Sequence, residues 1–249
     1  MYNQTVSSNF LTFLPVNYII FSFANIAYGG KMKAEEIISK VDHTYLKQTS
    51  TWTDIKRICD EAVEYHTYTV MVPSCFVPLI KKEYKDALTI ATVVGFPNGN
   101  CNTAAKIAET AQALADGASE IDMVINIGML KAGETAFVTN EIKALKRLCG
   151  DRVLKVIVET CFLTDEEKIA ACKCVTEAGA DFIKTSTGFG TGGATLADIE
   201  LFKKHIGKGV SMKASGGIRT REEMEAFIKA GCARLGASSA VSVLKDELK

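Results

Sequence analysis

The hydrophobic residues of this chain gather in eight short runs, and amphipathic stretches separate one run from the next. The runs are rich in β-branched and apolar residues, as buried strands are. They lie at Val41–Leu46, Tyr68–Pro73, Thr89–Pro97, Glu120–Gly128, Val153–Thr160, Ala180–Thr187, Gly209–Gly217 and Ala233–Ala240. Strands that alternate with helices along a chain are typical of parallel sheets.

The stretches between the runs carry helix signals. Trp52, Ile55 and Cys59 recur at the spacing of one helical face. Thr164 and Glu167 have the spacing of a capping box, which predicts a helix that begins there and continues to Ala178. Each predicted strand is therefore followed by a predicted helix.

A recurring glycine supports the same alternation. Gly117, Gly179 and Gly231 each end an amphipathic stretch just before an apolar run, as a glycine in the left-handed conformation ends a helix. Eight strand–helix units without a break in composition predict an α/β fold, a single-domain (β/α)8 TIM barrel. A doubly wound open sheet is the structural alternative.

Charge is spread unevenly along the 249 residues. Residues 1–30 contain no Asp, Glu, Lys or Arg, whereas the remainder holds all 29 Lys and Arg and all 29 Asp and Glu. We therefore expect residues 1–31 to be an N-terminal extension outside the fold, with translation starting at Met32, and residues 32–249 to be the barrel domain. A signal peptide is the alternative because Phe10–Tyr28 is apolar, but no basic segment precedes it and Pro15 interrupts it.

The composition excludes several classes of partner. The formal net charge is zero, which gives no general electrostatic reason to bind nucleic acid or a membrane surface. The eight cysteines are scattered through apolar segments, and no CxxC pair occurs, so we expect free thiols and a cytoplasmic protein. Because the three histidines are neither close nor spaced as metal ligands, we expect no metal and no cofactor.

Two lysines stand late in strands that are otherwise apolar. Lys184 follows Phe182-Ile183, and Lys213 follows Ser211-Met212 in the next predicted strand. A lone strand lysine usually reaches the surface or pairs with a carboxylate. Two on adjacent parallel strands would lie close together, and like charges that close lower the pKa of at least one amine. A neutral amine can attack a carbonyl carbon and form a Schiff base.

Asp122 is a candidate for proton transfer in such chemistry. It lies inside the apolar run Ile121–Ile125. The alternative role is an ion pair with Lys155 of the following strand, and Glu159 is similarly placed for pairing. The residues alone do not decide which lysine is the nucleophile.

Glycine and serine follow the last three predicted strands. Barrels commonly bind a substrate phosphate with the loops after strands seven and eight, where backbone N–H groups and hydroxyls converge. The candidate phosphate-binding residues are Gly188, Gly216, Gly217, Ser238 and Ser239. The alternative is that the glycines only form turns. The segment Gly188–Gly193 also matches G-x-G-x-x-G, but no acidic residue ends the next strand, so dinucleotide binding is rejected.

Six segments, in order, resemble deoxyribose-phosphate aldolases, a family of class I aldolases with a (β/α)8 fold. The segments are Val41–Thr44, Val93–Gly99, Glu120–Val124, Lys155–Thr160, Asp181–Phe189 and Lys213–Arg219. The resemblance runs from about Ile37 to Ser242. It implies reversible cleavage of 2-deoxy-D-ribose 5-phosphate to glyceraldehyde 3-phosphate and acetaldehyde, in deoxyribose phosphate catabolism.

The resemblance also implies roles for individual residues. Lys184 would form the Schiff base, Lys213 would keep Lys184 deprotonated, and Asp122 would donate and accept protons with a water molecule. The glycine and serine candidates named above would form the phosphate cradle. The expected partners are a small sugar phosphate and an aldehyde, with no nucleic acid and no membrane, in a homo-oligomer.

Two departures from the family pattern limit this transfer. Val70-Met71-Val72-Pro73-Ser74 stands where the family often has Val-Cys-Val-Asn-Pro, so substrate contacts from the second strand are in doubt. Some members also end in a tyrosine that this C-terminus lacks. The competing functions are a phosphosugar isomerase that uses a carboxylate base and a sugar-phosphate binder without catalysis.

Overall fold

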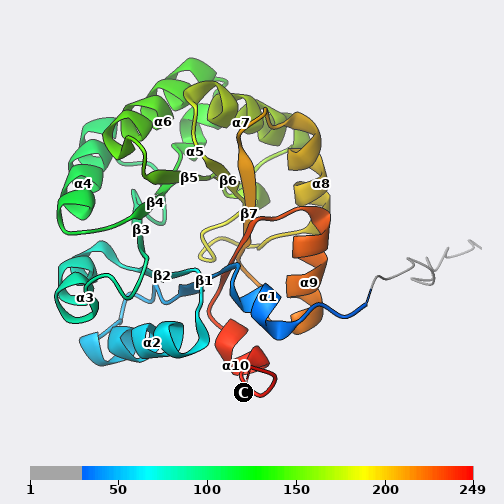
Figure 1. Ribbon diagram of the computed structural model, residues 1–249. Helices are drawn as coiled ribbons and strands as arrows, with labels where there is room; N and C mark the ends of the chain where they lie inside the picture. The colour runs from blue at the N-terminus through cyan, green and yellow to red at the C-terminus, as the bar shows by residue number, and fades with distance from the viewer. Residues whose placement is uncertain (1–29, 249) are drawn as a thin grey trace, which may run out of the picture. The chain divides into compact units, whose positions relative to one another are not determined.

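The computed structural model describes residues 30–248, in which eight parallel strands close into a barrel (Figure 1). Each strand pairs with the next along the chain, and β8 pairs with β1. The strands are β1 (Val41–Thr44), β2 (Thr69–Val72), β3 (Ile90–Val94), β4 (Glu120–Val124), β5 (Val153–Ile157), β6 (Phe182–Lys184), β7 (Ser211–Ser215) and β8 (Arg234–Ala237). The predicted TIM barrel is confirmed, and the open-sheet alternative is wrong.

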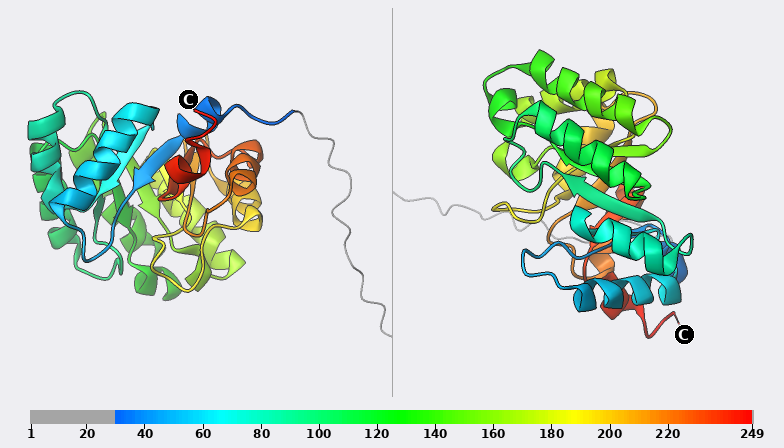
Figure 2. Two further views of the ribbon diagram at one scale, coloured as in Figure 1. Left: turned by 90° about the horizontal axis from the view of Figure 1, so that it is seen from below. Right: turned by 90° about the vertical axis from the view of Figure 1, so that its left-hand side faces the viewer.

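Helices form a layer around the barrel, as the views in Figure 2 show. They are α1 (Ala34–Ile38), α2 (Trp52–Tyr65), α3 (Val77–Tyr84), α4 (Thr103–Ala115), α5 (Ile127–Lys131), α6 (Thr135–Cys149), α7 (Asp165–Ala178), α8 (Leu196–His205), α9 (Arg221–Ala230) and α10 (Ala240–Leu244), with short 3-10 turns η1 (Ser74–Phe76) and η2 (Thr160–Phe162). Within residues 30–248, none of these helices is long and apolar enough to cross a membrane. The barrel unit begins at Met32. The expected extension stays a prediction, because residues 1–29 lie outside the described part of the chain.

The helix ends follow the local signals in the sequence. Thr164 accepts a hydrogen bond from the Glu167 backbone N–H, and the Glu167 side chain accepts one from the Thr164 N–H, so the predicted capping box is present. Gly179 and Gly231 end α7 and α9 in the left-handed conformation, at φ 74° and 112°. Local chemistry therefore sets where these helices begin and end.

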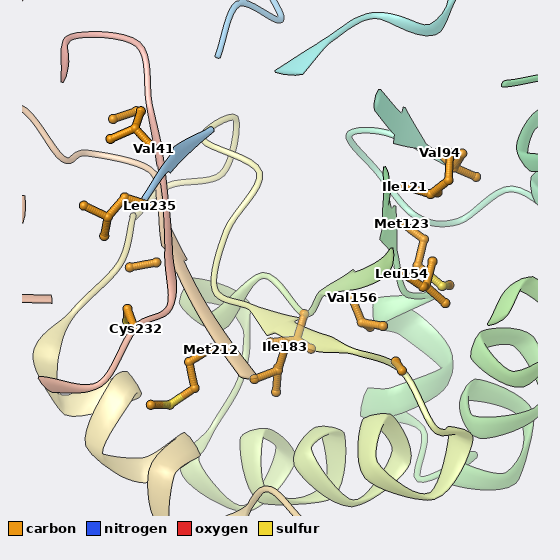
Figure 3. Close-up of a cluster of buried hydrophobic side chains, with 14 of the residues drawn as sticks. Val41, Val94, Ile121, Met123, Leu154, Val156, Ile183, Met212, Cys232 and Leu235 are labelled. Atoms are coloured by element: carbon orange, nitrogen blue, oxygen red, sulfur yellow. The ribbon is translucent and has the colours of Figure 1, made fainter. Parts of the chain in front are cut away.

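The apolar core lies between the strands and the helices. Figure 3 shows outward-facing side chains of the strands, among them Ile121, Met123 and Ile183, and all three are fully buried. Phe202 of α8 and Met224 of α9 belong to the same cluster. Successive strand residues alternate between the two faces of a sheet, so the neighbours of these apolar residues point into the barrel.

The strands end earlier than the hydrophobic pattern predicts. The run ending at Gly217 gives a strand that stops at Ser215, and the run ending at Thr187 gives one that stops at Lys184. The remainder of each run forms a loop at the carboxyl end of the barrel. Gly193 and Gly216 bring two of these loops together: Ala194 N–H donates to the Gly216 carbonyl at 3.1 Å, and a Cβ at Gly193 would collide with that carbonyl.

Candidate active site

Lys184, Lys213 and Asp122 meet inside the barrel. Lys184 and Lys213 are register partners on β6 and β7. The Nζ atoms of Lys184 and Lys213 lie 2.7 and 2.8 Å from the same Asp122 oxygen, Oδ2. The structure therefore brings together the three residues that the sequence singled out, although β4 is not adjacent to β6 or β7.

Four more charged side chains complete this group. Lys155 Nζ lies 2.8 Å from Asp122 Oδ1 and 2.5 Å from Glu120 Oε2. Arg234 donates to Glu120 at 2.7 and 3.2 Å and also to Asp42, which in turn accepts from Lys213. We call this group the charged cluster; within residues 30–248 it consists of Asp42, Glu120, Asp122, Lys155, Lys184, Lys213 and Arg234.

Sequence reasoning found the ion pair of Lys155 with Asp122 but assigned no role to Asp42, Glu120 or Arg234. Each of the three is buried and inward-facing. A signal was available, because each stands next to an apolar residue that faces the helices, as Arg234 stands next to Leu235. Their mutual contacts could not be read from the sequence, since they join β1, β4 and β8.

The cluster controls the protonation of its members. The pKa of Lys184 is lowered to about 8, chiefly by burial, with contributions from the positive charges of Lys213 and Lys155 and with opposition from Asp122. Burial alone would lower the pKa of Lys155, but its three carboxylate neighbours outweigh burial and raise it. The pKa of Asp122 is well below its usual range, because the surrounding lysines outweigh the effect of burial. Lys184 is thus an amine that loses its proton around pH 8, beside an ionised carboxylate.

A cavity of about 510 Å³ opens above the cluster at the carboxyl ends of the strands. Of the seven cluster side chains, Lys184 alone lines the cavity, while Asp122 and Lys213 lie fully buried beneath it. Main contributors to the wall are the loops after β1, β6, β7 and β8. The lining residues are Thr44, Tyr45, Leu46, Lys47, Arg57, Ile58, Lys184, Thr187, Gly188, Phe189, Ser215, Gly216, Gly217, Ile218, Arg219, Gly236, Ala237 and Ser238.

Most of the predicted phosphate-binding residues lie on this wall. Gly188, Gly216, Gly217 and Ser238 line the cavity together. Ser239 is not among the lining residues, and its hydroxyl donates to the Ile218 carbonyl at 3.2 Å, so its part in phosphate binding stays a prediction.

Three cationic side chains on the cavity wall were not predicted as site residues from the sequence. They are Lys47, Arg57 and Arg219. They stand in loops and on an exposed helix face, where a charged residue carries no signal of its own. Lys47 and Arg57 both lie against the ring of Tyr45, at 5.4 and 5.9 Å from its centroid. The cavity therefore offers positive charge as well as backbone N–H groups to an anion.

Comparisons with known proteins agree with this geometry. The model of the DeoC/LacD family of aldolases matches residues 36–247. The chain belongs to this family. It is 60% identical over 216 residues to a deoxyribose-phosphate aldolase of Clostridium botulinum (strain Alaska E43 / Type E3), covering 87% of this chain and 98% of that protein. It is 49% identical over 213 residues to a deoxyribose-phosphate aldolase of Clostridioides difficile (strain 630), covering 86% and 97%.

Solved structures show the same fold. A putative deoxyribose-phosphate aldolase from Coccidioides immitis has a TM-score of 0.84 at 36% identity, covering 88% of each chain. A tetrameric deoxyribose phosphate aldolase from Aeropyrum pernix has a TM-score of 0.80 at 28% identity, covering 86% of this chain and 92% of that one.

Glu159 has a different place from the one expected of it. Its backbone is left-handed, at φ 57°, two residues after the end of β5. Its carboxylate accepts from the Thr187 N–H at 3.2 Å and from the Thr187 hydroxyl. Glu159 thus joins the β5 and β6 loops and positions Thr187 on the cavity wall.

One side of the barrel interior is apolar instead of charged. Met71, Ala91 and Val93 of β2 and β3 pack together there, against Leu46 and Phe96. Pro73 and Ser74, where the sequence differs from the family pattern described above, come directly after β2. Neither of these two residues lines the cavity, so the cavity takes no contact from that part of the chain.

Proposed function

We propose that this chain is a class I aldolase that reversibly cleaves 2-deoxy-D-ribose 5-phosphate to D-glyceraldehyde 3-phosphate and acetaldehyde. The observation that carries the proposal is the Lys184 amine, whose pKa is lowered to about 8 and which is the cluster's one group on the cavity wall. The deoxyribose-phosphate aldolases that are 49% and 60% identical to the chain supply the substrate class.

The reaction begins at Lys184. Its neutral Nζ attacks C1 of the open-chain aldehyde, and the resulting carbinolamine loses water to form an iminium ion. Asp122, 2.7 Å from this nitrogen, stabilises the positive charge of the iminium and takes part in the proton transfers. Lys213 holds the same carboxylate oxygen and keeps it ionised.

Carbon–carbon cleavage then follows from the electron demand of the iminium. The C3 hydroxyl loses its proton, the C2–C3 bond breaks, and the electron pair moves into an enamine while C3 becomes the aldehyde of glyceraldehyde 3-phosphate. Protonation of the enamine at C2 and hydrolysis of the new iminium release acetaldehyde and return Lys184. No oxidant or reductant is consumed.

The substrate phosphate would bind where Gly188, Gly216 and Gly217 meet at the cavity wall. Glycines there leave backbone N–H groups accessible, and the Ser238 hydroxyl lies on the same wall. Both Gly216 and Gly217 have positive φ, at 85° and 79°, a conformation that side chains disfavour.

An isomerase that uses a carboxylate base is less well supported. Such a base must reach the substrate. Among the described residues, no Asp, Glu or His lines the cavity. The cluster's carboxylates lie beneath Lys184, each held by cations.

We also propose a homo-oligomer in the cytoplasm. The Aeropyrum pernix relative is tetrameric, which supports the first point. All eight cysteines are free thiols, five of them buried, and this fits a reducing compartment.

Trapping of the imine tests the function. The full chain is incubated with 2-deoxyribose 5-phosphate to measure glyceraldehyde 3-phosphate release, and separately with acetaldehyde and borohydride. We expect turnover, irreversible inactivation and an ethyl group on Lys184 by peptide mass spectrometry. Lys184→Leu is the control and should remain unlabelled. Turnover without labelling of Lys184 would refute the Schiff base, and no turnover would refute the substrate.

A further inference from the structure

Arg234 of β8 lies in the barrel interior below the cavity. Its side chain is 4% exposed, and it is absent from the cavity lining. The guanidinium carbon lies 3.2 Å from the centroid of the Tyr68 ring and 5.7 Å from that of Phe182. Its N–H groups go to both oxygens of Glu120 and to Asp42 Oδ1. The arginine therefore cannot touch a substrate but contacts two of the cluster's three carboxylates.

The contacts distribute the carboxylate oxygens unequally among the cations. Lys155 pairs with Asp122 Oδ1 and with Glu120 Oε2, and Arg234 also donates to Glu120 Oε2. The Lys213 amine takes Asp42 Oδ2 and also reaches Asp122 Oδ2.

Within the described contacts, Lys184 has one carboxylate oxygen, Asp122 Oδ2, and it shares that oxygen with Lys213. Lys184 is therefore the least well compensated cation of the cluster.

Charge counting leads to the same residue. The cluster holds three carboxylates and four basic groups, so one basic group has no negative charge to balance it. The imbalance disappears if one basic group loses its proton. Arg234 cannot be the group that does so, because a guanidinium keeps its proton in proteins. Without the arginine charge, three lysines would face three carboxylates, and Lys184 could keep its proton.

We propose that Arg234 is a positioning residue for the aldolase reaction: its permanent charge occupies Asp42 and Glu120 and leaves Lys184 as the uncharged amine. The inference rests on the proposed function, because it concerns the amine that forms the imine. Arg234 acts through the carboxylates and lysines, without contact to the substrate.

Other charged groups also face Lys184, and none of them takes over this role. The cluster supplies Asp122 from β4, Lys155 from β5 and Lys213 from β7. Across the open cavity lie the solvent-accessible side chains Tyr45, Lys47, Arg57 and Arg219, where water screens charge. Glu159 lies beyond β5 and is engaged with Thr187.

The pH dependence of kcat/KM tests the proposal. In the wild type, kcat/KM should rise with pH as Lys184 loses its proton, and the midpoint of this rising limb should lie near pH 8. In Arg234→Met this limb should move up by about one pH unit or more, which lowers kcat/KM about tenfold at neutral pH and restores it at high pH. Arg234→Lys supplies a charge that can itself be lost, so its limb should lie between those of the wild type and Arg234→Met.

Removal of a carboxylate from the cluster should move the kcat/KM limb in the direction opposite to that expected for Arg234→Met. Glu120→Gln should move the limb down, and the double variant Arg234→Met with Glu120→Gln should return it close to the wild-type position. The matched control is Arg221→Met. Arg221 is a buried arginine of α9 that pairs with Glu225 and Glu247 outside the barrel interior, and its loss should lower stability without moving the limb.

The outcomes separate this proposal from the proposed function. An active wild type with unmoved limbs in Arg234→Met and Glu120→Gln would overturn the role of Arg234, even if both variants were less stable. If Arg234→Met does not fold, the double variant is compared with Glu120→Gln: its limb should lie at higher pH than that of Glu120→Gln, and equal limbs in the two would overturn the role of Arg234. A wild type without aldolase activity would instead refute the proposed function.

Discussion

The two faces of the barrel strands differ sharply in composition. In β4, Ile121 and Met123 face the helices, whereas Glu120 and Asp122 face the interior. The outer face is a continuous apolar cluster, and much of the inner face is the charged cluster. Alternate residues of β4 thus belong to the apolar core and to the charged cluster.

The energetics of the two faces differ in the same way. Burial of apolar side chains on the outer face contributes roughly 25 cal/mol for each Å² removed from water. A buried ion cluster contributes little net stability, because the desolvation of its charges offsets their attraction. Removal of one member leaves its buried partners uncompensated, so substitutions on the inner face should change the chemistry as well as the stability. Substitutions on the outer face should change stability alone.

The largest effect is expected from Lys184→Leu. Loss of the nucleophile should reduce cleavage of 2-deoxyribose 5-phosphate by a factor on the order of 10⁴ or more, because the other amine on the cavity wall among the described residues, that of Lys47, is exposed and lies outside the charged cluster. The fold should persist, since leucine fits a buried site. Turnover and circular dichroism check both points, and near-normal turnover would contradict the assignment.

A smaller effect is expected from Lys213→Leu. Its positive charge lowers the pKa of Lys184, so its removal should move the limb of kcat/KM to higher pH. The loss of a fixed partner of Asp122 should reduce the rate by about 10²- to 10⁴-fold. A pH series of initial rates measures both, and an unchanged limb would show that Lys213 does not tune Lys184.

The outer face offers the converse test with Ile121→Ala. Ile121 is fully buried beside Asp122 but points to the helices. Its truncation should lower the free energy of unfolding by about 2 to 5 kcal/mol. The kcat/KM at 25 °C should stay within about twofold of the wild type. Urea unfolding and parallel kcat/KM measurements check this. A loss of kcat/KM without a loss of stability would contradict the assignment of different roles to the two faces.

The sequence predicted all eight strands and the central lysines, because hydrophobic runs and inward polar residues are local signals. It overestimated strand length beyond Lys184 and Ser215, since the short Thr, Ser and Gly residues that follow are compatible with a strand or a loop. The contacts of Arg234 with Asp42 and Glu120 stayed hidden, because closure of the barrel creates them. The contact of the Ser239 hydroxyl with the Ile218 carbonyl could not be predicted for a similar reason, because that carbonyl belongs to another loop.

A direct titration of the Lys184 amine tests the central claim that the charged cluster lowers the pKa of this one lysine to about 8. Lysine labelled with carbon-13 at Cε can be followed by NMR across the alkaline range, with Lys184→Leu to assign the signal. We expect a midpoint near pH 8 for Lys184. A midpoint at the ordinary lysine value, above about pH 10, would contradict the account.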